Sequence, residues 1–155
     1  MAIELEKHNK SIGLYEAFVP DITVNRQVNP DFDIVTYWGD DIAKLYDDKR
    51  FGNALSYTLE RKKADAVAVA GYINGEIIGM AGASRNYEKM WCMGYDVVPE
   101  HRNKGVAATL GKIITDLIID KGIVPYSTLA WSNIASKNTL ISIGYKSAWT
   151  AIGEQ

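Results

Sequence analysis

The chain has 155 residues, of which 47% are hydrophobic and 23% are charged, and this predicts one globular domain with a core of ordinary size. The formal net charge of -2 gives no general attraction to nucleic acid or to an anionic membrane, and no apolar run is long enough to span a bilayer. Cys92 is the only cysteine, which excludes an internal disulfide and fits a reducing compartment. We therefore expect a cytoplasmic protein, monomeric or homodimeric, without nucleic-acid or membrane partners.

Residues 1–38 give the weakest structural signals. The apolar stretches 14–19 and 32–37 are predicted as short strands. Two helices are predicted after them, one beginning at Ile42 behind two aspartates that can cap it and one over residues 54–62, whose cationic end suits the helix dipole.

The middle of the chain predicts three consecutive antiparallel strands. Residues 66–73 are small or β-branched, and residues 76–84 form a second apolar run after Asn74 and Gly75. An Asn-Gly pair between two such runs is a strong hairpin signal, because both turn residues need a positive φ. A third strand is predicted over residues 90–98.

The last third alternates helices and strands. Helices are predicted over residues 106–121 and 134–143, and strands over 124–131 and 145–152. The first helix has one apolar face, at spacings of three, four and one. A strand–helix–strand crossover requires a parallel pair. We therefore expect the α/β (α+β) class, with a mixed, mostly antiparallel central sheet and helices on both faces.

The turn between the third strand and the first of these helices has the composition of an anion site. The first amides of a helix lack intrahelical partners and carry the positive end of the dipole. Gly105 lets the backbone approach a ligand, while Arg102 and Lys104 add positive charge. An ordinary strand-to-helix turn with surface cations explains the same residues equally well.

Two motifs in this region resemble the GNAT superfamily of N-acetyltransferases. Residues 97–102 read Val-Val-Pro-Glu-His-Arg and residues 102–107 read Arg-Asn-Lys-Gly-Val-Ala, like the family's Arg/Gln-x-x-Gly-x-Gly/Ala loop and the stretch before it. Asn133 and the later Gly144-Tyr145 pair match a second family pattern. The resemblance covers about residues 66–152 and implies a single GNAT domain over residues 1–155, with residues 1–65 on the acceptor side and 66–152 as the acyl-CoA core.

The resemblance implies that acetyl-CoA lies in an extended cleft. Its pantetheine arm would run between the strands that end near Val97 and Trp131, and its diphosphate would rest on the amides of residues 103–108. Asn133 also has a simpler explanation as a helix cap, and for Ser136 exposure and binding explain the residue equally well. The predicted cofactor-binding residues are Val97, Val98, Arg102, Asn103, Lys104, Gly105, Val106, Ala107, Ala108, Asn133, Ser136 and Asn138.

The implied mechanism is direct attack of an amine on the thioester in a ternary complex, without a metal ion. It requires proximity, an oxyanion donor and a route for the amine proton. The backbone N–H of Val97 is the predicted oxyanion donor. Many family members carry a tyrosine as general acid at the position of Leu140, so Tyr145 and Tyr126 are candidates for that role, although packed aromatic residues with a hydrogen-bonded hydroxyl are the favoured interpretation of both.

The resemblance therefore implies an N-acetyltransferase that acts on a primary amine of a small molecule or a protein. Leu140 motivates an alternative from another class, a non-catalytic module that binds or senses acyl-CoA. The acceptor cannot be read from the sequence, because fold-level similarity does not name a substrate.

Overall fold

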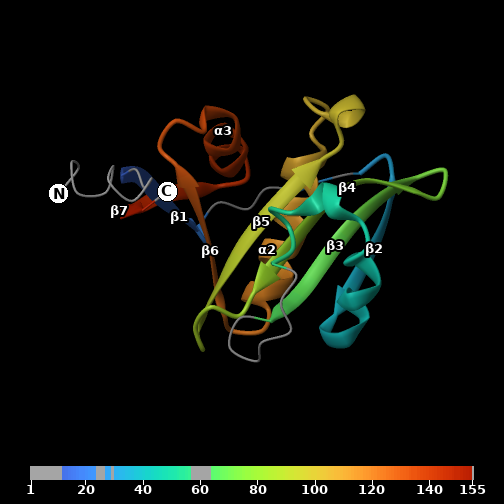
Figure 1. The fold of residues 1–155 in the computed structure, drawn as a ribbon, viewed down its shortest axis with the longest axis horizontal. Coiled ribbons are helices and arrows are strands. Elements are labelled where there is room, and N and C mark those ends of the chain that lie inside the picture. The colour runs from blue at the N-terminus through green and yellow to red at the C-terminus, as the bar shows by residue number, and fades with distance from the viewer. Residues whose placement is uncertain (1–11, 24–26, 29, 57–63, 155) are drawn as a thin grey trace.

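The computed structural model describes residues 12–23, 27–28, 30–56 and 64–154, which build one seven-stranded mixed sheet in the order β2-β3-β4-β5-β6-β1-β7 (Figure 1). This arrangement confirms the predicted fold class. The strands are β1 (Ile12–Pro20), β2 (Asp33–Trp38), β3 (Asp65–Ile73), β4 (Glu76–Ser84), β5 (Met90–Val97), β6 (Val124–Ala130) and β7 (Tyr145–Glu154). The helices are the 3-10 helices η1 (Gly39–Leu45), η2 (Lys49–Phe51) and η3 (Pro99–His101) and the α-helices α2 (Val106–Ile119) and α3 (Ile134–Ser142).

Strands β3, β4 and β5 form the predicted antiparallel meander. Asn74 and Gly75 make the hairpin turn with φ angles of 52° and 82°, as the Asn-Gly signal predicts. Helix α2 then crosses over to β6, which pairs in parallel with β5. Both the hairpin and the parallel crossover are therefore confirmed.

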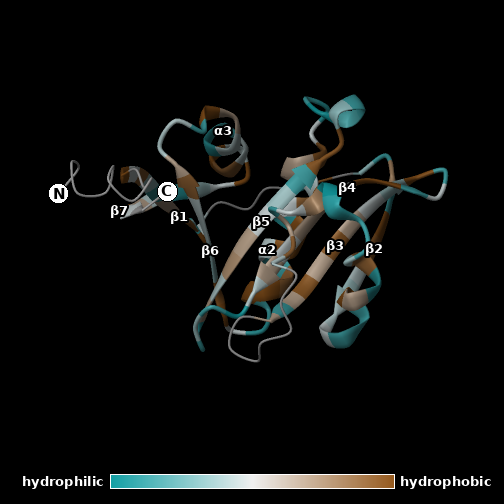
Figure 2. Ribbon diagram, viewed as in Figure 1, coloured by the Kyte–Doolittle hydropathy of each residue, from teal (hydrophilic) through white to brown (hydrophobic). Residues whose placement is uncertain are grey.

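Helix α2 covers one face of the meander. Leu110, Ile114 and Ile118 are fully buried there, and Figure 2 shows hydrophobic residues along α2 and the strands beside it. Gly79 in β4 allows this close packing, because a Cβ at that position would lie 2.8 Å from Cγ1 of Val106. The side chains of α2 therefore reach the backbone of β4, which fixes the start of the helix relative to that strand.

The opposite face is covered by η1, η2 and the backbone of residues 52–56. A Cβ on Gly94 would lie 1.9 Å from the carbonyl oxygen of Asn53, and one on Gly82 would lie 2.0 Å from that of Ala54. Two glycines on neighbouring strands thus let this segment lie directly on the sheet. The contact forms one wall of the site described below.

The helix predicted to begin at Ile42 is present, but its predicted start and its predicted aspartate cap were wrong. The segment is a 3-10 helix that begins at Gly39, and its cap Trp38 makes no side-chain hydrogen bond. Ile42 and Leu45 are both buried, three residues apart, which suits the three-residue turn of a 3-10 helix. The helix predicted over residues 54–62 falls largely on residues 57–63, which lie outside the described residues, and Ala54 to Ser56 are not helical.

Strand β1 takes a place that the sequence did not indicate. It lies between β6 and β7, antiparallel to both, and it buries Ala17 and Phe18. The N-terminal strand thus completes the half of the sheet formed by the C-terminal strands. The division of the domain at residue 65 remains a prediction. Three elements differ slightly from their predicted bounds: β5 ends at Val97, α2 ends at Ile119 and β7 continues to Glu154.

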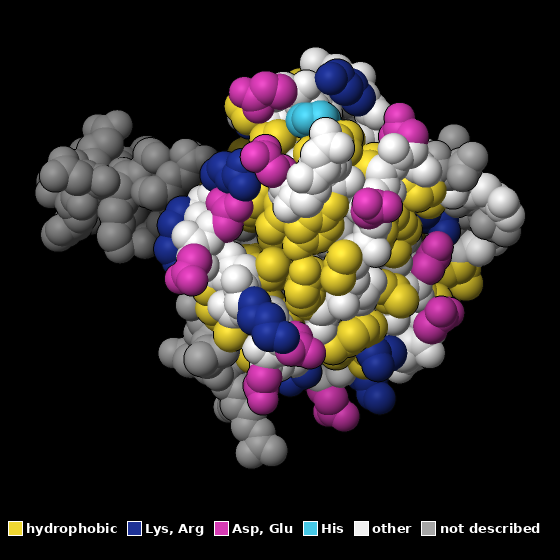
Figure 3. Space-filling view, turned by 90° about the vertical axis from the view of Figure 1, so that its right-hand side faces the viewer, with side chains coloured by type: hydrophobic (Ala, Val, Ile, Leu, Met, Phe, Trp, Pro, Cys, Tyr) yellow, Lys and Arg dark blue, Asp and Glu magenta, His cyan; other side chains and the backbone are white. Residues whose placement is uncertain are grey.

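Charged side chains of both signs surround the hydrophobic patch on the face shown in Figure 3. Exposed pairs such as Lys44 with Asp41 and Arg50 with Asp48 illustrate this mixture, which agrees with the small net charge. Among the described residues, no helix combines the length and the apolar character needed to cross a bilayer.

Candidate functional site

Strands β5 and β6 separate after three residue pairs. They pair only from Met90 with Val124 to Cys92 with Tyr126. Beyond this point β5 continues along β4 as far as Val97, whereas β6 continues along β1. The predicted separation of these two strands is therefore confirmed.

The separation leaves backbone groups of both strands directed into the gap. The N–H of Val98 donates to the carbonyl of Ile78 in β4 at 3.0 Å. Because bonding directions alternate along an antiparallel strand, the N–H and C=O groups of residues 93, 95 and 97 face away from β4. The N–H of Trp131 donates to Leu14 in β1 at 2.8 Å, so by the same alternation residues 128 and 130 face the gap from β6. An extended ligand can thus bind here as an added strand does.

The loop before α2 leaves a run of amides open. Gly105 precedes the helix with a φ of 79°, and Asn103 has a φ of 59°. The first bond into the helix runs from the N–H of Thr109 to the carbonyl of Gly105 at 2.9 Å. Within the described chain, no acceptor pairs with the backbone N–H groups of residues 103–108. Such consecutive amides at a helix N-terminus form an anion-binding concavity.

These amides border a cavity of about 840 Å³, here named the loop cleft. Its edge at Gly105 is open, because a Cβ there would meet no atom within 4 Å. Lys104 and Val98 do not line it; Lys104 is exposed and Val98 is buried. The structure brings the other predicted cofactor-binding residues to this cleft: Val97, Arg102, Asn103, Gly105, Val106, Ala107, Ala108, Asn133, Ser136 and Asn138.

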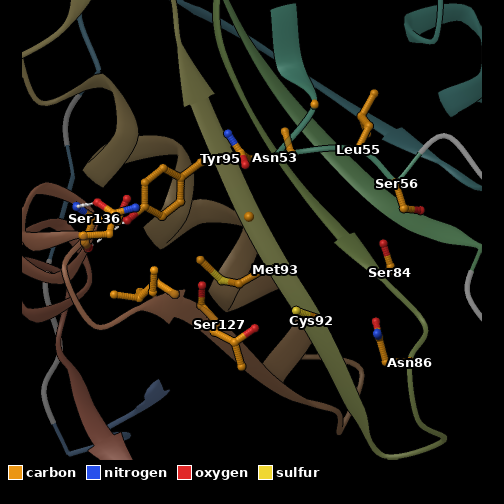
Figure 4. A pocket seen from close by; sticks show the side chains of 17 residues that line it. Asn53, Leu55, Ser56, Ser84, Asn86, Cys92, Met93, Tyr95, Ser127 and Ser136 are labelled. Atoms are coloured by element: carbon orange, nitrogen blue, oxygen red, sulfur yellow. Dashed lines mark hydrogen bonds between the residues drawn. The ribbon is translucent and has the colours of Figure 1, made fainter. Parts of the chain in front are cut away.

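Helix α3 forms the opposite wall of the loop cleft. Oδ1 of Asn133 accepts a hydrogen bond from the N–H of Ser136 at 3.1 Å, which confirms the predicted helix cap. The hydroxyl of Tyr95 donates to the carbonyl of Ser136 at 2.9 Å, and Figure 4 shows this side chain reaching from β5 to α3. Burial raises the pKa of Tyr95, so it stays a protonated donor. Sequence reasoning missed Tyr95, because nothing local marks a tyrosine that bridges two elements.

Replacing Asn133 with alanine is expected to lower the free energy of unfolding by about 1 kcal/mol, because the substitution removes this helix cap. Thermal or urea denaturation measures the change. Asn138→Ala serves as a matched control within α3 and should leave stability nearly unchanged. Equal stabilities for the two variants would contradict the capping role.

A second cavity of about 530 Å³ lies over β5 and β6 and is here named the strand cleft (Figure 4). Four residues border both cavities, so the two are neighbours along the gap: Asn53, Tyr95, Asn133 and Ser136. The remaining walls of the strand cleft come from residues 52–56, from the end of β4 and from β6.

Asp96 holds the wall formed by residues 52–56. Its Oδ2 accepts from the N–H groups of Asn53 at 2.7 Å and Ala54 at 3.0 Å, and its Oδ1 accepts from Nδ2 of Asn53 at 2.6 Å. One carboxylate on β5 therefore fixes the segment that faces the gap. Only the folded structure reveals this role, because the partners lie more than forty residues apart in sequence.

Tyr145 and Tyr126 line neither cleft. Tyr145 is 4% exposed, and its hydroxyl bonds Oγ1 of Thr115 at 2.8 Å and Sδ of Met93 at 3.0 Å. Burial raises the pKa of both tyrosines. Tyr126 packs its ring 6.0 Å from that of Trp149. The general-acid role of either tyrosine therefore remains a prediction, and this geometry does not support it.

The structure also places Leu140, which stands where many family members have a tyrosine, and Cys92, the single cysteine. Leu140 is fully buried in the core, so no side chain at this position faces either cleft. Cys92 borders the strand cleft, and burial raises the pKa of its thiol, which disfavours the thiolate that a nucleophile needs. Among the described residues, no three His, Cys, Asp or Glu side chains gather as metal ligands would.

Comparisons with known proteins bear on the family and the fold of this chain. The model of the acetyltransferase (GNAT) family matches residues 33–144. A comparison with curated protein sequences found no match.

Several solved structures share the fold. They include a GNAT-family acetyltransferase structure from Novosphingobium aromaticivorans, described as putative (TM-score 0.68, 20% identity), which covers 91% of this chain and 62% of its own. A GCN5-related N-acetyltransferase-like protein from Streptococcus suis has a TM-score of 0.72 at 10% identity and covers 99% of this chain and 66% of its own. A tandem GNAT protein from the clavulanic acid biosynthesis pathway has a TM-score of 0.62 at 12% identity. The match covers 91% of this chain and 54% of that protein. This chain thus spans less than two thirds of each of these proteins.

Proposed function

Because the chain belongs to the GNAT family of acetyltransferases, we propose that it transfers the acetyl group of acetyl-CoA to a primary amine of a small molecule or protein. The observation that carries the proposal is the run of open amides over residues 103–108, next to the gap between β5 and β6. The diphosphate binds these amides and Arg102. The pantetheine arm follows the gap, and the thioester reaches the strand cleft.

The geometry suits direct attack. A thioester in the strand cleft lies beside the backbone groups of residues 93 and 95, which border that cleft. Val97, the predicted oxyanion donor, borders only the loop cleft, so the N–H groups of residues 93 and 95 are the proposed oxyanion donors. The carbonyl of Val97 accepts a hydrogen bond from Nε of Arg102 at 3.0 Å, which ties the end of β5 to the loop. The acceptor amine then enters from the strand cleft, which supplies the proximity that the reaction needs.

Calorimetry and an assay for released CoA thiol test this function together. The proposal expects acetyl-CoA to bind and primary amines to accelerate thiol release. Absence of binding at millimolar acetyl-CoA would contradict it.

A non-catalytic acyl-CoA sensor is the second candidate, favoured by one observation. Leu140 is buried and neither candidate tyrosine lines a cleft, so no described side chain at these positions protonates the leaving thiolate. A thiolate is a fair leaving group even without such an acid. Tight binding without turnover on any amine would favour the sensor.

A further inference from the structure

Asp65 is a buried carboxylate that the mechanism above does not use. It is 4% exposed, and no lysine, arginine or histidine pairs with it in the described chain. Its oxygens accept hydrogen bonds from the hydroxyls of Tyr46 at 2.9 Å, Ser56 at 2.7 Å and Ser84 at 2.7 Å. The backbone N–H of Ser56 also donates to it at 3.0 Å. Within the described part of the chain, hydrogen bonds and not an ion pair therefore hold the Asp65 carboxylate inside the protein.

This charge lies next to the strand cleft. Asp65 is paired with Ser84 in the sheet, and Ser84 is paired with Cys92. Paired residues of antiparallel neighbours lie on the same face, so these side chains form a row that ends where β5 and β6 separate. Ser84 and Cys92 both line the cleft, and Figure 4 shows Ser84 beside Ser56 on its wall.

The hydroxyl of Ser84 has a fixed direction. A serine hydroxyl carries one proton, and Ser84 donates it to Oδ1 of Asp65. Toward a ligand, its oxygen can therefore only accept a hydrogen bond. None of the described residues that line the strand cleft is charged, so this part of the lining does not neutralise the Asp65 carboxylate, which lies one hydroxyl behind the wall.

We propose that the Asp65–Ser84 pair recognises the ammonium form of the acceptor, which makes the natural acceptor a cationic alkylamine. This inference rests on the proposed transfer function and names its substrate class. Ser84 contacts the ammonium group, and Asp65 acts through it as a positioning residue. A weakly basic amine gains little at this site, because it lacks the charge that the carboxylate attracts.

The same pair gives the amine a route for its proton. The ammonium group passes one proton to Ser84 Oγ, which passes its own to Asp65 and from there to solvent. The neutral amine forms the C–N bond with the thioester carbon, and the C–S bond breaks. The second nitrogen proton goes to the CoA thiolate, so the products are the N-acetylamine, CoA thiol and one released proton.

The test compares two acceptors that differ in charge at neutral pH, n-butylamine, which is an ammonium ion, and methoxyamine, which is neutral. Ser84→Ala should lower kcat/KM for n-butylamine by about tenfold, as expected for loss of a hydrogen bond to a charged group, and change kcat/KM for methoxyamine about twofold at most. Asp65→Asn should show the same selectivity. Asp33→Asn on the exposed edge strand β2 and Thr36→Ala on the same strand are the matched controls and should leave both acceptors unchanged.

The outcomes separate the inference from the function on which it rests. Equal losses for the two acceptors, or no loss in Ser84→Ala, would overturn the ammonium site while leaving the transferase intact. If the unaltered protein acetylated neither n-butylamine nor methoxyamine, the inference would fail, whereas the transferase function is judged by acetyl-CoA binding and thiol release with primary amines. Ser84→Ala keeps the test decisive if Asp65→Asn fails to fold, because Ser84→Ala leaves the bonds from Tyr46 and Ser56 to Asp65 in place.

Discussion

Gly105→Val is expected to weaken acetyl-CoA binding by about 100-fold, equivalent to about 2.7 kcal/mol. A valine strains the backbone at a φ of 79°, because the left-handed region costs a side chain about 1–2 kcal/mol. Its Cβ would also enter the open space at the edge of the loop cleft, where the diphosphate is proposed to bind. Calorimetric titration with acetyl-CoA measures the loss.

Gly122→Val is the matched control for this strain. Gly122 has a φ of 71° and also has no atom within 4 Å of an added Cβ, but it follows the far end of α2. The two variants should lose similar stability, while only Gly105→Val loses acetyl-CoA affinity. Normal affinity in Gly105→Val would show that the phosphates bind elsewhere.

Gly94→Ala is expected to lower the free energy of unfolding by about 3 kcal/mol, as overpacking does, and to reduce acetyl transfer. The new Cβ would lie 1.9 Å from the carbonyl oxygen of Asn53, so residues 52–56 must move off the sheet. That movement breaks the hydrogen bonds from Asn53 and Ala54 to Asp96. Urea denaturation and steady-state kinetics with n-butylamine measure the two effects.

Gly52→Ala tests whether the effect comes from this contact. Gly52 lies in the same segment at a φ of -69°, and a Cβ there would meet no atom within 4 Å. It should therefore retain stability. Acetyl-CoA affinity should fall much less in Gly94→Ala than in Gly105→Val, because the phosphate loop is untouched. Wild-type stability of Gly94→Ala would contradict the packing of residues 52–56 on β5.

Local rules predicted the second half of the fold because its signals are local. The Asn74-Gly75 turn, the apolar face of α2 and the Asn133 cap each depend on residues a few positions apart, and each lies where the sequence placed it. The open loop at Gly105 followed from the same kind of reasoning, because helix N-termini leave amides unpaired wherever they occur.

Contacts between distant segments could not be predicted in this way. The place of β1 between β6 and β7 depends on pairings across more than one hundred residues, and nothing in residues 12–20 specifies those partners. Tyr95, Asp96 and Asp65 were missed for the same reason, since each takes its role from a partner on another element. Asp65 in particular reads as an ordinary polar residue before a strand until Ser56 and Ser84 are seen around it.

Backbone amide spectra of the protein titrated with CoA and with pantetheine test the central claim most directly. The two ligands share the pantetheine arm, but only CoA carries the phosphates. We expect CoA to shift the N–H resonances of residues 103–108 strongly and pantetheine to leave them in place. If CoA bound while these resonances stayed unchanged, the open amides before α2 would not hold the diphosphate.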